Sequence, residues 1–292
     1  MGKSILNVGG FTIIRRIGVG ARSTIYLARD EQSKETVALK RVIYEKPEDL
    51  RVFEQVENEF KVSQQLDHAY IRKCLKIKRI RSMFKVTELL LSMEHFEADS
   101  LEDTDTLSLI DVMLVFRMVA TGLHAMHQKG LVHCDIKPNN ILMNKNGAVK
   151  IIDLGQSCKI GTIKDRIQGT PNYIAPEQVE RRPLGPRTDI FNLGATMYWA
   201  LTGENVPTKI PVRGDNVIGR NVPKECRPPH VKHSRIPKDL SEIVMACVHE
   251  DVNERPMNMM ELVSALDGMI RGLLQGRKKA GENAAVDNSA TG

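Results

Sequence analysis

The sequence predicts an α+β fold of two unequal lobes, and three observations lead to this prediction. Residues 1–96 alternate short β-type runs with turns and contain one stretch of helical periodicity. In residues 97–275 the apolar positions recur mostly at helical spacing. The chain of 292 residues is 41% hydrophobic and 27% charged, which is ordinary for a soluble protein with a buried core. We therefore expect a strand-rich lobe over residues 1–96 and a larger helical lobe over residues 97–275.

The individual elements follow from local patterns. Strands are expected where β-branched and other apolar residues cluster between turns, at residues 11–17, 23–29, 36–43, 75–79 and 85–93. Apolar residues spaced among charged ones predict a helix over residues 47–66, and the same pattern predicts helices at 107–129, 190–202, 240–248 and 257–275. Residues 276–292 are polar and rich in alanine, glycine and asparagine, which predicts a disordered tail.

The cysteine pattern and the absence of targeting features indicate a cytoplasmic protein. The five cysteines are scattered, and no two of them form a Cys-x-x-Cys pair, which is typical of reduced thiols. No window approaches the ~18 consecutive apolar residues that a membrane helix needs. The N-terminus has no apolar core followed by a cleavage site. We expect no secretion and no membrane anchor.

The positive charge of the chain is concentrated in one stretch. The net charge is +6, from 42 Lys+Arg against 36 Asp+Glu, and residues 205–238 alone contain eight basic and two acidic residues. Six prolines in this stretch exclude a long helix and indicate a surface loop. A solvated basic surface is one interpretation, and a docking face for an acidic protein is the other. Because the excess is confined to this stretch, we expect no nucleic-acid partner.

A glycine-containing turn joins the first two expected strands. It reads Gly18-Val19-Gly20-Ala21-Arg22-Ser23, and its glycines would let backbone N–H groups approach phosphate oxygens. An ordinary hairpin turn is the alternative. A strand follows the turn, where a dinucleotide-binding fold has a helix, so the turn does not indicate that fold.

A lysine lies at the end of the next strand. Lys40 follows Val37-Ala38-Leu39 and could extend into water, as lysines at strand ends often do. It could also neutralise phosphate, provided that a carboxylate holds it in place. Glu57 and Glu59 lie on the following helix, and the sequence leaves both open as that carboxylate.

The densest group of chemically active side chains lies at residues 133–140. Asp135 can accept a proton from a hydroxyl, Lys137 can steady a transferring phosphoryl group, and Asn140 can bind a metal. Asp153 follows the β-type run 149–152 and precedes Leu154-Gly155. A carboxylate at the end of a strand suits a hard divalent cation.

The glycine-containing turn, the strand lysine, the helix glutamate, the group at residues 133–140 and Asp153-Leu154-Gly155 follow one another along the chain. Motifs of this kind in this order resemble those of the protein kinase superfamily, Ser/Thr branch, in its bacterial-type form, over residues 11–274. The resemblance implies a bilobal kinase-like fold that transfers the γ-phosphoryl group of ATP to Ser or Thr hydroxyls of proteins. It implies that Lys40 contacts the phosphates and pairs with Glu59, and that Asp135 is the catalytic base. Asn140 and Asp153 would hold Mg²⁺, or alternatively Mn²⁺.

The resemblance also assigns the nucleotide pocket and the substrate platform. The residues expected to contact the nucleotide, besides Lys40 and Asp153, are Ile17, Gly18, Val19, Gly20, Ser23, Ile25, Ala38, Met93, Glu94, Phe96 and Leu142. The segment 169–177 resembles the platform for a protein substrate, and Lys137 with Thr170 is typical of Ser/Thr specificity. Arg255 would pair with Glu177 in a structural role.

Three residues depart from the family pattern. Ser23 replaces a glycine of the glycine-containing turn, and because serine is small we expect little effect. Ser63 replaces an apolar residue, and we expect this change to weaken the packing that holds the helix carrying Glu59 in place. Cys134 stands where the family has an arginine that binds a phosphate on the activation segment. We therefore expect activity to depend little on phosphorylation of Ser157 or Thr162, both taken as exposed hydroxyls.

Two other functions remain as alternatives. A pseudokinase that binds partners without turnover would explain the three departures, but Lys40, Asp135, Asn140 and Asp153 are all present. A small-molecule phosphotransferase of similar fold has no need of the segment 169–177. The sequence therefore favours an active protein kinase.

Overall fold

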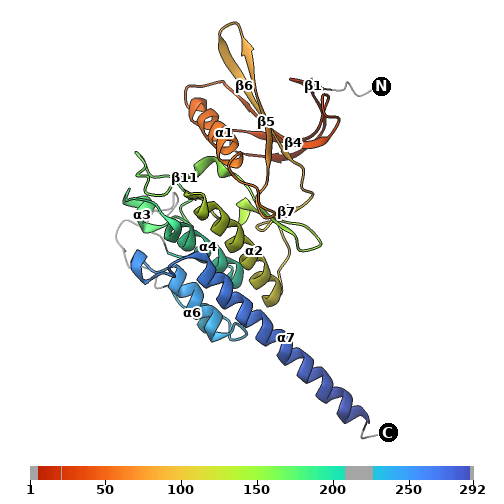
Figure 1. Cartoon of the computed structure of the whole chain (residues 1–292), viewed down its shortest axis with the longest axis vertical. Coiled ribbons are helices and arrows are strands. Elements are labelled where there is room, and N and C mark those ends of the chain that lie inside the picture. Colours follow the sequence, from red (N-terminus) through yellow and green to blue (C-terminus); the bar gives the residue numbers. More distant parts are fainter. Residues whose placement is uncertain (1–5, 21, 208–225, 290–292) are drawn as a thin grey trace, which may run out of the picture. The chain divides into compact units, whose positions relative to one another are not determined.

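The computed structural model of the chain describes residues 6–20, 22–207 and 226–289 (Figure 1). The chain divides into two compact units, and the first contains residues up to Asp99 together with Leu142–Cys158. The second contains Ser100–Ile141 and the residues from Lys159 onward. The sequence had placed the boundary at residue 96 and residues 142–158 in the second lobe. The structure differs because the backbone of Ile151 is hydrogen-bonded to Tyr70 and Arg72, at N···O distances of 2.7 and 3.0 Å.

The first unit is built on one antiparallel sheet of six strands. The strand order is β1-β2-β3-β4-β6-β5, and every neighbouring pair is antiparallel. The strands are β1 (Asn7–Val8), β2 (Phe11–Val19), β3 (Thr24–Asp30), β4 (Thr36–Ile43), β5 (Cys74–Ser82) and β6 (Lys85–Glu94). The five longer strands confirm the five strands expected from the sequence, with ends that differ by a few residues.

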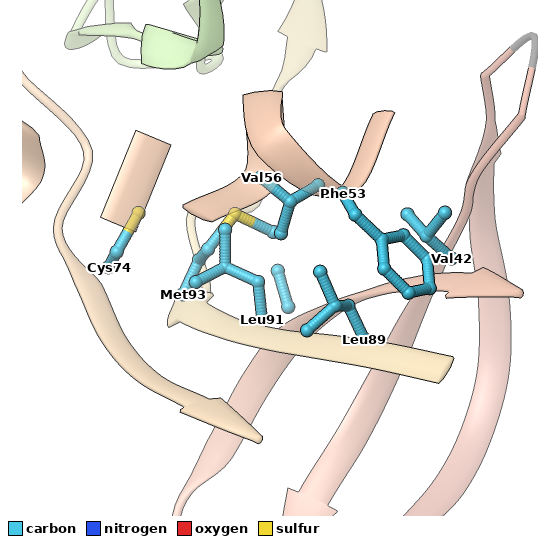
Figure 2. Packing of buried hydrophobic residues seen from close by; sticks show 8 residues of the cluster. Val42, Phe53, Val56, Cys74, Leu89, Leu91 and Met93 are labelled. Atoms are coloured by element: carbon cyan, nitrogen blue, oxygen red, sulfur yellow. The ribbon is translucent and has the colours of Figure 1, made fainter. Parts of the chain in front are cut away.

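Helix α1 (Asp49–Ser63) covers one face of this sheet and closes its main core. Figure 2 shows Phe53 and Val56 of α1 directed toward Leu89 and Leu91 of β6. Leu90 points to the opposite face, where it joins a second buried cluster, because successive side chains of a strand alternate between faces. The strand β6 is therefore buried on both sides, which explains its continuous apolar run.

Several short elements complete the path of the chain. They are β7 (Asp99–Ser100), β8 (Leu131–Val132), η1 (Pro138–Asn140), β9 (Ile141–Met143), β10 (Val149–Ile151), η2 (Leu154–Gln156) and β11 (Cys158–Lys159). The elements β7, β8, β9, η1, η2 and β11 are only two or three residues long, too short for a periodic pattern to reveal them. The sequence anticipated only β10, as a β-type run.

The second unit is mainly helical. Its helices are α2 (Leu109–Gln128), α3 (Pro176–Val179), α4 (Pro186–Thr202), α5 (Pro229–Lys232), α6 (Lys238–Cys247), η3 (Val252–Glu254) and α7 (Met259–Ser289). The backbone N–H of Asp111 donates to the Ser108 hydroxyl, which caps the N-terminus of α2. Gly194 of α4 lies so close to Cys247 of α6 that a Cβ at this position would collide with its side chain. A glycine is required there for the two helices to pack.

Helix α2 qualifies as a candidate membrane span by length and composition, although its sequence does not contain the ~18 consecutive apolar residues expected of a membrane helix. An 18-residue window in it has a mean hydropathy of 1.6, because Asp111 and Arg117 are its only Asp, Glu, Lys or Arg residues. Half of that window is buried inside the unit, where α2 packs against α4 and α7. A core helix of a globular domain meets the same criteria, so one such helix is weak support for a membrane span.

The C-terminal residues correct a second expectation. Helix α7 continues to Ser289, although residues 276–292 were expected to be a disordered tail. Alanine, lysine, arginine and glutamate predominate at residues 277–285, and these residues have high intrinsic helix propensity despite their polar character. The centre of the basic stretch 205–238 lies outside the described residues, as does the end of the tail.

Candidate active site

Lys40 is the centre of a charged cluster in the first unit. Its Nζ lies 2.5 Å from Glu59 Oε2 and 3.6 Å from Asp153 Oδ1. Burial alone would lower the pKa of the Lys40 ammonium, but the charges of Glu59 and Asp153 outweigh burial and raise that pKa. The side chain of Glu59 is nearly inaccessible, whereas that of Asp153 is 42% exposed. The cluster therefore keeps a permanent positive charge beside an accessible carboxylate.

The geometry decides between the two candidate glutamates of α1. Glu59 follows Val56 by three residues and so shares the buried face of the helix. Glu57 lies on the outer side, where its Oε1 accepts a hydrogen bond of 2.9 Å from Arg79 Nε. Glu59 is thus the partner of Lys40, as the resemblance implied.

The segment that carries Asp153 is fastened to α1. Asp153 has a left-handed backbone (φ 63°), and Gly155 lies against Gln55, whose carbonyl oxygen would be 3.1 Å from an added Cβ. Asn58 Nδ2 donates to the carbonyl oxygens of Gly155 and Ser157, at 3.1 and 2.8 Å. Sequence reasoning missed Asn58, because nothing in its pattern distinguishes it from other polar residues of a helix.

The glycine-containing turn is compact where it is described. The Gly20 N–H donates to the Ser23 carbonyl oxygen at 2.8 Å, and a Cβ on Gly20 would lie 2.7 Å from Ser23 Oγ. Gly18 has ordinary room, and neither glycine has a positive φ. Ile17 and Val19 are exposed, at 38% and 69%. The turn therefore favours glycine at position 20 because of crowding by the serine that replaces the third loop glycine.

All of the residues expected to contact the nucleotide belong to the first unit. Ala38 and Met93 are paired across β4 and β6, and both are buried in the core that Figure 2 shows. Ile25 packs against the same core, and Leu142 is half-buried. These apolar side chains come from β3, β4, β6 and β9.

Glu94, one of the residues expected to contact the nucleotide, is bound to Lys150 of β10 by an ion pair. Both carboxylate oxygens of Glu94 lie within 3.0 Å of Lys150 Nζ. The same ammonium lies 6.0 Å from the centre of the half-buried Phe96 ring. Lys150 therefore fixes the Glu94 side chain beside β10.

Ser63 supports α1 in a way that the sequence did not indicate. Its Oγ accepts a hydrogen bond of 2.8 Å from the backbone N–H of Cys74, the first residue of β5. Both residues are buried. The serine was expected to weaken the support of the helix, but it joins the last turn of α1 to the sheet.

In the second unit, Asp135, Lys137 and Thr170 form a small hydrogen-bonded group. Thr170 Oγ1 donates to Asp135 Oδ1 at 2.9 Å and accepts from Lys137 Nζ at the same distance. Lys137 Nζ also lies 3.5 Å from Asp135 Oδ2. A hydroxyl is therefore already hydrogen-bonded to the carboxylate, with an ammonium beside both. This is the arrangement that general base catalysis on an alcohol requires.

Asn140 is oriented by the same aspartate. Its Nδ2 donates to the Asp135 carbonyl oxygen at 2.8 Å and lies 3.3 Å from Asp135 Oδ2. Because the amide nitrogen is committed to Asp135, the amide oxygen is the atom that Asn140 can offer to a cation. Asn140 is buried, so this orientation is held firmly.

Asp189 of α4 holds the backbone before Asp135. Its carboxylate accepts hydrogen bonds of 2.8 Å from the backbone N–H groups of His133 and Cys134. Cys134 has φ 67°, a left-handed conformation that these bonds stabilise. Burial alone would raise the pKa of Asp189, but the hydrogen bond with His127 and its charge keep that pKa below its ordinary value.

A comparison of the sequence with models of protein families identifies the family of the chain. The family model described as "Protein kinase domain" matches residues 11–265. The chain belongs to the protein kinase family.

Three relatives illustrate the similarity of this kinase domain to Ser/Thr kinases. Serine/threonine-protein kinase STE20 of Candida glabrata is 31% identical over 82% of this chain and 26% of its own length. Serine/threonine-protein kinase CST20 of Candida albicans is 31% identical over 87% of this chain and 21% of its own length. Serine/threonine-protein kinase PAK 1 of Mus musculus is 30% identical over 87% of this chain and 46% of its own length. The chain thus spans between about a fifth and a half of the length of these relatives.

The predicted pairing of Arg255 with Glu177 is confirmed in the kinase domain. The guanidinium makes two parallel bonds to the carboxylate, of 2.8 and 3.0 Å. Its remaining N–H groups donate to the carbonyl oxygens of His249, Arg187 and Glu250. All five donors are therefore used, and both side chains are buried. This pair anchors α3, the end of the expected substrate platform.

The two hydroxyls that the sequence suggested to be exposed, those of Ser157 and Thr162, are not exposed. Ser157 is 4% exposed and lies beneath Asn58, so it is not the exposed hydroxyl that the sequence suggested. Thr162 is half-buried, and its Oγ1 donates to the Lys159 carbonyl oxygen at 2.7 Å.

A second residue that sequence reasoning missed is Gln178, which directly follows the Ala175-Pro176-Glu177 motif and is buried.

Proposed function

We propose that the chain is an ATP-dependent protein kinase that phosphorylates Ser and Thr hydroxyls of proteins. The ion cluster of Lys40, Glu59 and Asp153 carries the proposal, because Asp153 lies 113 positions after Lys40 and the fold still brings Lys40 Nζ within 3.6 Å of Asp153 Oδ1. A structural lysine would need only one carboxylate. The Ser/Thr kinases among the relatives support the class of acceptor.

The first unit supplies the nucleotide-binding groups in this proposal. The Lys40 ammonium neutralises phosphate oxygens, and Glu59 holds the lysine in position. The apolar side chains of Ile25, Ala38 and Leu142 enclose the base, and the backbone of residues 94–96 supplies its hydrogen bonds. Phosphoryl transfer relies on such positioning and charge neutralisation more than on covalent chemistry.

The donor set fits a hard divalent cation. Asp153 offers an accessible carboxylate, and Asn140 offers an amide oxygen whose orientation Asp135 fixes. We propose Mg²⁺, with Mn²⁺ as an alternative, as the cation for which Asp153 of the first unit and Asn140 of the second unit are donors. When bound, the cation would neutralise the charge that develops on the transferred phosphate.

The second unit supplies the groups that act on the acceptor. Asp135 accepts the proton of the substrate hydroxyl as its oxygen forms a bond to the γ-phosphorus, and the bond from that phosphorus to the ADP oxygen breaks. Lys137 lies 3.5 Å from Asp135 and steadies the negative charge of the transferring group. The Thr170 hydroxyl donates to Asp135 Oδ1 at 2.9 Å, which supports the proposal that a substrate hydroxyl can hydrogen-bond to the same carboxylate.

Two further proposals concern the protein substrate and the cellular location. Acidic protein substrates would suit the positive charge of residues 205–238, whose attraction would weaken with added salt. A cytoplasmic location would suit the scattered cysteines, none of which belongs to a Cys-x-x-Cys pair.

The proposed function is tested by Asp153→Asn. The variant loses the carboxylate that serves both Lys40 and the cation, and we expect phosphoryl transfer from ATP to a mixed protein substrate to fall at least 100-fold. Asp67→Asn is the matched control, because Asp67 is 87% exposed and its ion pair with Lys73 lies at the surface. Equal, near-zero transfer by the parent and by Asp153→Asn would instead support a pseudokinase.

Phosphorylation of the activation segment is expected to matter little. In the double variant Ser157→Ala, Thr162→Ala, we expect the rate of transfer to stay within 100-fold of the parent, since Ser157 is buried and Cys134 offers no charge for a phosphate. Initial rates with labelled ATP, measured before and after phosphatase treatment of the parent, check this. A larger loss, above about 2.7 kcal/mol of barrier, contradicts the expectation.

A further inference from the structure

Gln178 of α3 is a buried amide that uses its full hydrogen-bonding capacity. Its Nε2 donates to the carbonyl oxygens of Cys134 and Gln168, at 2.8 and 3.1 Å. Its Oε1 accepts from the Ala175 backbone N–H at 3.0 Å and from Asn192 Nδ2 at 2.9 Å. With two donors and two acceptor positions engaged, the side chain has one stable orientation. It is 4% exposed.

The partners of Gln178 lie immediately beside the two groups that meet at the acceptor site. Cys134 precedes Asp135, and Gln168 lies two residues before Thr170. Gly169 between them has φ 138°, and an added Cβ would lie 3.2 Å from Gln178 Nε2. The turn that presents Thr170 therefore rests directly on the amide of Gln178.

The bonds to Cys134 and Gln168 join two segments that are far apart in the sequence. If the amide were removed, the buried Cys134 carbonyl oxygen and the part-buried Gln168 carbonyl oxygen would each lose the hydrogen bond that Gln178 donates, and losing such bonds in a buried place is costly. The turn at Gly169 would then shift to recover a partner. A displacement near 1 Å between Thr170 and Asp135 is enough to disturb a reaction that depends on positioning.

We propose that Gln178 is a positioning residue that holds the Thr170 turn against Asp135 and preforms the acceptor site without any phosphate on the chain. The proposal rests on the proposed kinase function. The groups that meet at Gln178 are two carbonyl oxygens, a backbone N–H and the amide of Asn192, and none of them carries a charge. We call Gln178 with these four hydrogen bonds the clamp, and its formation requires no phosphorylation of the chain.

The test compares Gln178→Met with the parent, both in the full-length chain treated with phosphatase. Methionine keeps the volume of glutamine and removes all four hydrogen bonds. We expect kcat to fall at least 30-fold while KM for ATP changes less than threefold, because Lys40, Glu59 and Asp153 are untouched. Gln128→Met is the matched control, since Gln128 is an exposed residue at the end of α2. A kcat within threefold of the parent overturns the proposal.

A double-mutant cycle separates positioning from general destabilisation. Gln178→Met is combined with Thr170→Val, which removes the hydroxyl that the clamp is proposed to place. If Gln178 acts through Thr170, the double variant loses little more activity than the more damaging single variant. Independent, multiplied losses contradict the proposal and indicate a structural role alone.

Hydrogen exchange on the parent protein tests the clamp without any substitution, even where the variants do not fold. The Ala175 amide, which donates to Gln178, should exchange slowly in the phosphatase-treated chain. Fast exchange at Ala175 overturns the proposal. An inactive parent with a protected Ala175 amide would show instead that the clamp exists and that the proposed kinase function is wrong.

Discussion

Asp135→Asn should reduce kcat for phosphoryl transfer by at least 1,000-fold, about 4 kcal/mol of barrier. In the structure, the Asp135 carboxylate accepts the proton of the Thr170 hydroxyl in a 2.9 Å hydrogen bond. Asparagine has the same shape but cannot take up a proton, and general base catalysis typically contributes 10²–10⁴-fold. Steady-state rates with saturating ATP and a protein substrate measure the loss.

Two comparisons make this result specific to the proton acceptor. Asp105→Asn changes an exposed aspartate of the same unit and should leave kcat within twofold. The nucleotide affinity of Asp135→Asn should match that of the parent, because the ion cluster around Lys40 is unchanged. If Asp135→Asn retains more than a tenth of the parental kcat, Asp135 is not the base.

Arg255→Leu should destabilise the second unit by about 3–5 kcal/mol. The substitution removes the fully buried guanidinium and leaves the Glu177 carboxylate, 3% exposed, without its cationic partner. It also takes the donor from three backbone carbonyl oxygens, those of His249, Arg187 and Glu250. Urea unfolding followed by fluorescence of the single tryptophan, Trp199 in α4, reports on this unit.

The control for this loss is Arg271→Leu on α7. Arg271 is exposed, so its substitution should change the free energy of unfolding by no more than about 0.5 kcal/mol. A shift of less than 1 kcal/mol for Arg255→Leu would mean that the surrounding helices provide the anchoring of α3 without the ion pair.

The sequence was sufficient to predict the groups that meet at Lys40 and at Asp135. A lysine, an amide and several carboxylates at these spacings form an unusual combination, and their order along the chain restricts the possible folds. It was not sufficient to choose between Glu57 and Glu59 from the residues alone, because that choice depends on which face of α1 is buried. The resemblance made the choice, and the burial of Glu59 agrees with it.

Other features depended on packing that no local pattern contains. Ser157 looked like an exposed hydroxyl, yet Asn58 of α1 covers its backbone from a position 99 residues away. Gln178 looked like any polar residue that follows a motif, and only the fold reveals its four partners. Ser63 shows the same limit, since its partner Cys74 begins a strand beyond the helix.

The discontinuous first unit has a consequence for how the chain matures during translation. Residues 142–158 return to this unit and supply Asp153 to Lys40 and a backbone pairing to Tyr70 and Arg72. The sheet can assemble early on the ribosome, since domains fold as their residues emerge. Its ion cluster, however, must wait until Asp153 has been synthesised, so a nascent chain arrested before that residue would leave the lysine with Glu59 as its sole counter-ion in that cluster.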